Sequence, residues 1–165
     1  ESRRVVPVRW LVEQDVVPQD GSGVNAVLPD GVAVGDYYLD HHHDKDHRPP
    51  GERLGEQYPD NAPFQISFGA MVPEAVDGLI AAEKCIGATH IVNGCSRLQP
   101  VAVAIGQAAG EAAAQAALGG VPVRELDVAA VQRALVAAGC VIVPDREVGC
   151  EDPRFAARQL ERVGR

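Results

Sequence analysis

Between Val101 and Gly120 the chain is built almost entirely of Ala, Val, Gly and Ile, and this run restricts the possible folds more than any other feature. A membrane span needs about 20 such residues, so length alone would allow one. However, Gln107, Glu111 and Gln115 recur every four residues and would share one face of a helix. A helix with one polar edge is typical of soluble proteins, so we predict a core helix and no membrane partner.

Three helices are predicted in the C-terminal half from apolar spacing and from residues that start or stop a helix. Pro100 favours the first turn of the first helix, and Gly120 ends it. Asp127 can cap the second helix, which Gly139 ends, and Asp152 can cap the third. The predicted ranges are 97–120, 127–139 and 152–163.

Strands are predicted where apolar, often β-branched, residues form short runs. The residues from 18 to 35 are rich in Gly, Pro, Asp and Asn, which indicates turns or short irregular strands. Strands combined with the three helices predict an α/β fold of mixed α+β character, within the size of one ordinary domain. The predicted strands are 3–17, 64–72, 77–87 and 140–143.

Charge and cysteine content exclude some classes of protein. The net charge is -8, and proteins that bind nucleic acids usually present a basic face, so no nucleic-acid partner is predicted. The four cysteines form no CxxC pair, and a chain of this size needs no disulfides to fold. We therefore expect reduced thiols and a cytoplasmic protein.

Residues 40–47, with the sequence DHHHDKDH, are the most polar part of a long predicted loop. Imidazole and carboxylate groups can bind transition metals, but adjacent side chains of an extended loop point apart. We therefore predict no metal site. One or two histidines of this loop could act as a general acid or base near neutral pH, and the alternative is a loop that is simply solvated.

A second polar group precedes the small-residue helix. Glu83 ends an apolar run, Thr89 and His90 follow it, Asn93-Gly94 predicts a tight turn, and Arg97 stands just before the helix. The start of a helix attracts anionic groups because its N–H groups are unpaired. Gly106 and Gly110 would leave a groove on the helix. These features fit a ligand site, and they fit close packing of a helix on a sheet equally well.

Several segments resemble bacterial FAD-dependent oxidoreductases with a glutathione-reductase-type FAD domain, specifically their C-terminal segment. The similar parts are ESRRVV at residues 1–6, VAVGDYYLDHH at 32–42, Val72-Pro73 and GQAAGEAAA from Gly106, and they span residues 1 to about 138. The isolated positions that also match are Leu79, Ala82, Thr89, His90, Gly94, Arg97 and Pro100.

The resemblance implies an FAD cofactor that lies against the start of the small-residue helix, with the strand around Leu79–Lys84 closing the FAD-binding sheet. It also implies a small organic substrate that is oxidised or reduced through the flavin. Arg97, His42 and His90 would orient substrate or move a proton. The implied cofactor-binding residues are Glu83, Cys85, Gly94, Arg97, Leu98 and Gln99.

Two departures from the resemblance shape the interpretation. Most relatives carry Gly where this chain has Glu83, although fumarate-reductase-like flavoproteins carry a comparable Glu that contacts FAD. The strand–GxGxxG–helix unit that grips the FAD pyrophosphate is missing, because GSGVNA at 21–26 lacks a preceding strand and a following helix. We therefore expect the C-terminal portion of a Rossmann-type FAD domain, without its N-terminal dinucleotide-binding half, that binds FAD poorly alone.

The expected organisation has three parts: substrate-domain strands and the His-rich loop at 1–75, FAD-domain residues at 76–138, and a C-terminal extension at 139–165. Exposed apolar surface on such a chain could associate with a second copy, so a homo-oligomer remains an alternative to a monomer. Two alternatives remain for function. One is a non-catalytic ligand-binding or interaction domain derived from such an enzyme, and the other is a metal-dependent hydrolase that uses the histidine loop.

Overall fold

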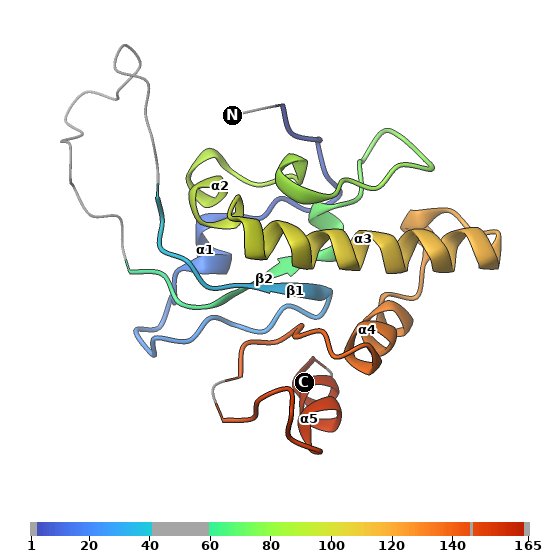
Figure 1. The fold of residues 1–165 in the computed structure, drawn as a ribbon. Coiled ribbons are helices and arrows are strands. Elements are labelled where there is room, and N and C mark those ends of the chain that lie inside the picture. The colour runs from blue at the N-terminus through green and yellow to red at the C-terminus, as the bar shows by residue number, and fades with distance from the viewer. Residues whose placement is uncertain (1–2, 41–59, 146, 164–165) are drawn as a thin grey trace, which may run out of the picture.

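The computed structural model describes residues 3–40, 60–145 and 147–163 (Figure 1). A long helix, α3, crosses the middle of the molecule, and a two-stranded sheet lies beside it. Helices α4 and α5 follow on the sheet side of α3, and α2 with the N-terminal segment lies at the other end. Among the described residues, the fold is a mixture of five helices and this small sheet, so the predicted mixed α/β class is confirmed.

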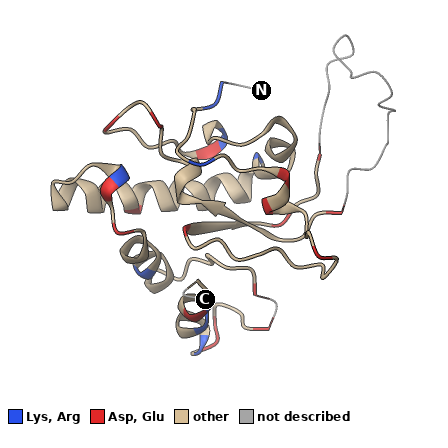
Figure 2. Ribbon diagram, turned by 180° about the vertical axis from the view of Figure 1, so that it is seen from behind, with Lys and Arg blue, Asp and Glu red and all other residues tan. Residues whose placement is uncertain are grey.

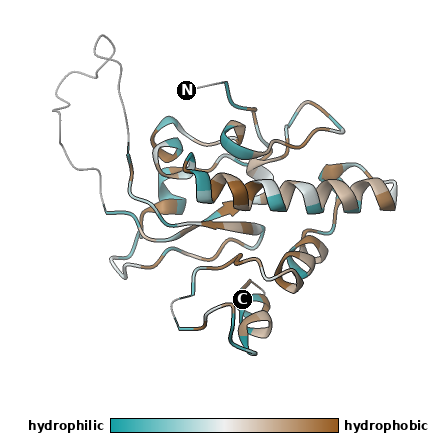
Figure 3. Cartoon of the chain, in the orientation of Figure 1, coloured by the Kyte–Doolittle hydropathy of each residue, from teal (hydrophilic) through white to brown (hydrophobic). Residues whose placement is uncertain are grey.

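Helix α3 covers Gln99–Gly119, as predicted from its proline and glycine boundaries. Gly120 ends it with a left-handed backbone, φ 63°. By length and composition α3 could cross a membrane, and it is the only such helix in the described part of the chain. Figure 3 shows apolar residues concentrated along its first half. Its side chains buried within the protein are Val101, Ala102, Ile105, Ala108, Ala109, Ala112 and Ala116.

The prediction that Gly106 and Gly110 hold α3 close to the sheet is wrong. A Cβ atom added at either glycine would meet nothing within 4 Å, so both face open space. The residues that let α3 approach its neighbours are alanines, because Ala108 and Ala112 are completely buried. The small residues of α3 therefore lie on two faces, with Ala108 and Ala112 on the packed face and Gly106 and Gly110 on the open one.

The sheet consists of β1, Gly31–Gly35, and β2, Phe64–Ser67, which pair antiparallel. Both strands are almost entirely buried, and β1 packs on α3. The predicted strand 64–72 is therefore too long, since a 3₁₀ turn at Phe68–Ala70 follows β2 directly. The carbonyl of Asp30 accepts the Phe68 N–H at 2.8 Å, which turns the chain out of the sheet.

The predicted strand 3–17 is also wrong. Its residues make only isolated bridges, Pro7 with Pro73 and Leu11 with Ala88, and its end forms the short helix α1, Glu13–Val16. The Asp15 carboxylate accepts the Val12 N–H at 3.0 Å and so stabilises the first turn of that helix. The extended part satisfies its backbone against two separate segments, which do not form a continuous ladder.

Two further apolar runs are only partly buried and are not strands. In 77–87 the Ala81 N–H donates to Met71 at 2.7 Å, and the chain then turns through a 3₁₀ turn at Glu83–Cys85. In 140–143 the N–H groups of Ile142 and Val143 donate to the side-chain oxygen of Gln159, at 2.9 and 2.8 Å. Tertiary contacts of this kind replace the expected strand ladders, so the prediction that the Leu79–Lys84 region closes a sheet is wrong.

The remaining helices agree better with the sequence. Helix α4 covers Val128–Ala137, and the Asp127 side chain caps it by accepting the Ala129 N–H, as predicted. A 3₁₀ turn at Val123–Glu125 links α3 to α4. Helix α5 covers Phe155–Val163 and begins three residues after the predicted cap. One apolar core extends through all of these elements, from Leu11 to Phe155.

Candidate functional site

The site suggested by the sequence lies where α2 ends and α3 begins. Helix α2 covers His90–Ser96, so the tight turn expected at Asn93-Gly94 is instead the middle of a helix. The Thr89 hydroxyl caps α2 by accepting the Val92 N–H at 3.3 Å, and it donates to Glu13 at 2.9 Å. Asn and Gly have low helix propensity, which favours the predicted turn. The Thr89 cap stabilises the first turn of α2 and so offsets this low propensity.

Gly94 lets the chain at Asp40 lie directly on α2. A Cβ atom at Gly94 would lie 2.8 Å from the carbonyl oxygen of Asp40, which is closer than real Cβ contacts allow. Only glycine therefore fits this position of the helix without a shift of the neighbouring backbone. The predicted importance of Gly94 thus has a physical cause in the structure, which is close approach of two chain segments.

The same approach brings Asp40 to Arg97, the residue that ends α2. The Arg97 Nη2 atom lies 3.0 Å from Asp40 Oδ2 and 3.3 Å from the Asp40 carbonyl oxygen. Both side chains are about one-third exposed, at 30% and 29%. The Arg97 Nε atom is buried and has no partner among the described residues. Asp40 therefore holds Nη2 of the guanidinium, while the neighbouring donor Nε is unused.

Helix α3 starts two residues after Arg97, with Leu98 between them as its N-cap. No side chain among the described residues caps this start, and Gln99 and Pro100 are exposed. Figure 2 shows that α3 is almost free of charged residues, since Glu111 is the only one between Gln99 and Gly119. The partial positive charge of the helix start is thus added to the charge of Arg97 without a nearby acidic side chain on α3.

Glu83 and Cys85 lie in the 3₁₀ turn that packs against α3. Glu83 is exposed and has a φ of 65°, the only positive φ at a non-glycine residue in the described part of the chain. Cys85 is half-buried, and its thiol donates to the Ala82 carbonyl at 3.0 Å. The structure therefore brings this turn and α3 together, with the Glu83 carboxylate facing solvent.

The predicted catalytic histidines are not assembled around Arg97. His90 is the exposed first residue of α2, and Arg97 follows the last, so about 10 Å of helix rise separates them. His42 lies outside the described residues, as does most of the histidine-rich loop. Within the described ranges, no group of three or more His, Cys, Asp or Glu side chains is arranged to hold a metal ion.

Two polar residues near Arg97 were missed by sequence reasoning. Asn93 and Ser96 are buried, with exposed fractions of 4% and 2%. Asn93 was noted only as part of a predicted tight turn, and Ser96 gave no distinctive signal. The Asp40–Arg97 pair was also not foreseen as a contact, because 57 residues separate the two in the sequence.

The family model described as FAD dependent oxidoreductase matches residues 1–135. No curated protein and no solved structure matches the chain. The matched range contains Asp40, the 3₁₀ turn at Glu83 and the junction of α2 and α3, and it ends inside α4. Residues 136–165 lie beyond it.

Proposed function

The chain belongs to the FAD dependent oxidoreductase family, and we propose that it supplies the surface of such an enzyme against which the flavin ring lies. The proposed surface is the start of α3 together with Arg97 and the turn at Glu83. When bound, the flavin would supply transfer of a hydride or electrons from a small organic substrate. The residues of this chain would bind the ring and stabilise its negative charge.

The single observation that supports this proposal most is the arrangement of Arg97. Asp40 binds the Nη2 atom of the guanidinium, while the buried Nε atom has no partner within the described residues. Buried polar atoms are normally hydrogen-bonded, so an unused donor beside an uncapped helix start fits an electron-rich ligand atom. A flavin carbonyl that becomes negative on reduction has this character, and fixed donors stabilise such charge without reorganising.

Other residues have supporting roles in the proposal. Leu98 and Gln99 would offer backbone N–H groups at the start of α3, and Gly94 keeps Asp40 close enough to fix Arg97. Glu83 would accept a hydrogen bond from a cofactor hydroxyl, and Cys85 would lie beside it. His42 and His90 are proposed to orient substrate or move a proton.

The pyrophosphate-binding part would come from elsewhere in the enzyme. The sequence GSGVNA at 21–26 is exposed loop for most of its length, without a helix after it. A GxGxxG motif binds pyrophosphate only between a strand and a helix. We therefore propose that these 165 residues act as the C-terminal, flavin-facing part of a Rossmann-type FAD domain and its neighbouring substrate domain.

The proposal is tested with protein expressed from the complete open reading frame. We expect a yellow protein whose visible absorbance is bleached by a chemical reductant, as bound flavin requires. Arg97→Gln should slow flavin reduction by about 10²-fold or more, the size of effect seen when one fixed donor to a developing negative charge is removed. Arg133→Gln, which removes an exposed arginine paired with Asp127, is the matched control and should leave the rate unchanged.

A colourless protein that stays colourless after FAD is added would contradict the proposal. Normal flavin reduction in Arg97→Gln would contradict the role given to Arg97 while leaving the flavin assignment intact. The two results are therefore distinguishable.

A further inference from the structure

A cavity of about 270 Å³ lies where the C-terminal segment meets two earlier parts of the chain. None of its lining residues belongs to the α2–α3 junction. Its apolar wall contains Val24 from the loop before β1, Pro63 from just before β2, and Pro144. Its other wall is charged and belongs to residues beyond the range that the family model matches. A small cavity with apolar walls and a few convergent polar groups is typical of a ligand site.

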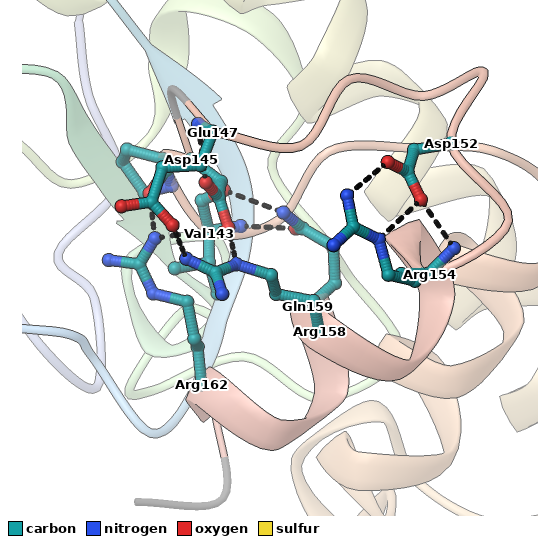
Figure 4. Close-up of polar contacts among 9 residues, drawn as sticks. Val143, Asp145, Glu147, Asp152, Arg154, Arg158, Gln159 and Arg162 are labelled. Atoms are coloured by element: carbon teal, nitrogen blue, oxygen red, sulfur yellow. Dashed lines mark hydrogen bonds and ion pairs between the residues drawn. The ribbon is translucent and has the colours of Figure 1, made fainter.

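The charged wall is built around Asp145, whose side chain is only 2% exposed. Arg158 Nε donates to Asp145 Oδ2 at 2.6 Å, and Arg162 Nη1 lies 3.5 Å from the same oxygen (Figure 4). One buried carboxylate thus faces two guanidinium groups, which leaves one positive charge uncompensated within this trio. Arg158 makes the closer contact with this carboxylate and Arg162 the looser one, so Arg162 depends on it less.

Glu147 supplies the fourth charge, but from the solvent side. Its carboxylate accepts a hydrogen bond from Arg158 Nη2, and its side chain is 75% exposed. Exposed ion pairs of this kind contribute little, because water and salt screen them. Glu147 therefore occupies an outer position that an incoming anion can share or take over.

Arg162 has donors that the protein does not use. Its Nη1 atom donates to the Pro144 carbonyl, while its Nε and Nη2 atoms have no partner in the described part of the chain. The side chain is 27% exposed and lines the cavity. Nε and Nη2 form one edge of the planar guanidinium, and such an edge matches the two oxygens of a carboxylate.

We propose that this cavity binds a small carboxylic acid with an apolar body. The carboxylate pairs with the free edge of Arg162, and the apolar body lies against Val24, Pro63 and Pro144. The four charged side chains together are neutral, so the incoming carboxylate takes over the outer position of Glu147, whereas inorganic phosphate brings more charge and no apolar surface. This site is separate from the proposed flavin surface and does not depend on it.

The proposal is tested by adding benzoate to the ¹⁵N-labelled chain and following its NMR spectrum. We expect saturable shifts at the Val24 amide and at the Nε–H signals of Arg158 and Arg162. Benzamide, the neutral analogue, should bind at least about tenfold more weakly, because it cannot form the charge-assisted pair. Inorganic phosphate should also bind more weakly than benzoate.

Variants then assign the binding to these side chains. Arg162→Gln should weaken benzoate binding about tenfold, while Arg154→Gln, on the same helix but 75% exposed and paired with Asp152, should leave it unchanged. Glu147→Gln should strengthen binding, since it removes the competing carboxylate from an exposed position. If Arg162→Gln does not fold, the benzoate affinity of Glu147→Gln tests the proposal instead.

Three results would overturn the proposal. They are equal affinity for benzoate and benzamide, benzoate binding that Arg162→Gln leaves intact, and benzoate binding that Glu147→Gln weakens or leaves unchanged. Binding of phosphate as tight as that of benzoate would show an anion site without the proposed selectivity, and would equally overturn it.

Discussion

Glu83 carries a side chain at a backbone position that favours glycine. Its φ of 65° lies in the left-handed region, which costs a residue with a side chain about 1–2 kcal/mol. Similar flavoproteins mostly carry glycine at this position, and the backbone explains why glycine suits it. A strained backbone kept at an exposed turn fits a functional role for the carboxylate, as the proposed contact with a cofactor hydroxyl requires.

Replacing Glu83 with Gly should therefore stabilise the chain. The variant removes the left-handed strain but adds about 0.4–1 kcal/mol of backbone entropy to the unfolded state, so we expect a net gain of about 0.5–1 kcal/mol. Urea unfolding measures this change. Lys84→Gly, at the next exposed position, has no such strain to relieve and should lower the free energy of unfolding by a similar amount.

In the complete protein the same Glu83→Gly variant should bind FAD more weakly despite its higher stability. Unchanged FAD affinity would mean that the carboxylate has no contact with the cofactor. A lower free energy of unfolding would instead show that Glu83 stabilises the turn by itself.

The residue scale also shows what sequence reasoning can find in the site. Arg97 could be predicted, since a charge just before a small-residue helix has a local meaning. Its contact with Asp40 could not, because it depends on how residues 57 positions apart are folded together. Gly94 was identified as important, but its reason, contact with the Asp40 backbone, exists only in three dimensions.

At the scale of the elements, the long helices were predicted well, whereas the short helices α1 and α2 and most of the strands were not. Helices α3 and α4 carry their signals locally, in apolar spacing, a proline, a capping Asp and ending glycines. The runs at 77–87 and 140–143 are apolar but only partly buried, and apolar composition alone does not supply a strand partner. In the second run, Gln159 and Gln65 provide the hydrogen bonds that a neighbouring strand would have made.

Replacement of Gly94 or Gly106 by alanine should change the free energy of unfolding in opposite directions. In Gly94→Ala the new methyl group would press on the Asp40 carbonyl at a cost of about 1–3 kcal/mol, while helix propensity returns about 1 kcal/mol. We expect a net loss of about 1 kcal/mol. In Gly106→Ala the methyl group meets nothing within 4 Å, so only the propensity gain of about 1 kcal/mol remains.

The two variants should thus differ by about 2 kcal/mol in the free energy of unfolding, measured by urea unfolding monitored by circular dichroism. Gly94→Ala should also shift the NMR signals of the Arg97 side chain, because Asp40 must move. Equal stability of the two variants would contradict the close approach of Asp40 to α2.

At the scale of the whole molecule, charge pairs within the C-terminal segment hold its loop to α5. Burial alone would raise the pKa of Asp145, but hydrogen bonds from Arg158 and from the Glu147 N–H outweigh it, so the pKa is lowered. A lowered pKa in the folded state means that the ionised form stabilises the fold above the unfolded pKa of about 3.9. That stability is lost as the pH falls through the lower, folded pKa.

The free energy of unfolding should therefore fall as the pH is lowered from 5 towards 2, and more steeply in the wild type than in Asp145→Asn. Asp152 contributes in the same direction, because its hydrogen bond from the Arg154 side chain lowers its pKa to about 2. Its contribution is present in both proteins, so the difference between the two pH profiles isolates Asp145. Parallel profiles would show that the arginine pairs do not act on this carboxylate.

The family match ends at residue 135, but the core does not. Ile142 and Val143 are completely buried, and Val148 and Phe155 are at least 94% buried. Gln159 accepts the Ile142 and Val143 N–H groups at 2.9 and 2.8 Å and donates to the Val143 carbonyl at 2.9 Å. The C-terminal segment is therefore part of the folding unit, although the family resemblance does not include it.

Removal of residues 140–165 should abolish cooperative folding. Four buried apolar side chains at about 1.5–3 kcal/mol each contribute about 6–12 kcal/mol, which equals the whole stability of a typical domain. Thermal unfolding followed by circular dichroism should show a sharp transition for the 165-residue chain and none for the shortened one. Removing only 164–165 is the control and should leave the sharp transition in place. A sharp transition at an unchanged temperature in the shortened chain would mean that the family-matched residues fold alone and that α5 is only attached to them.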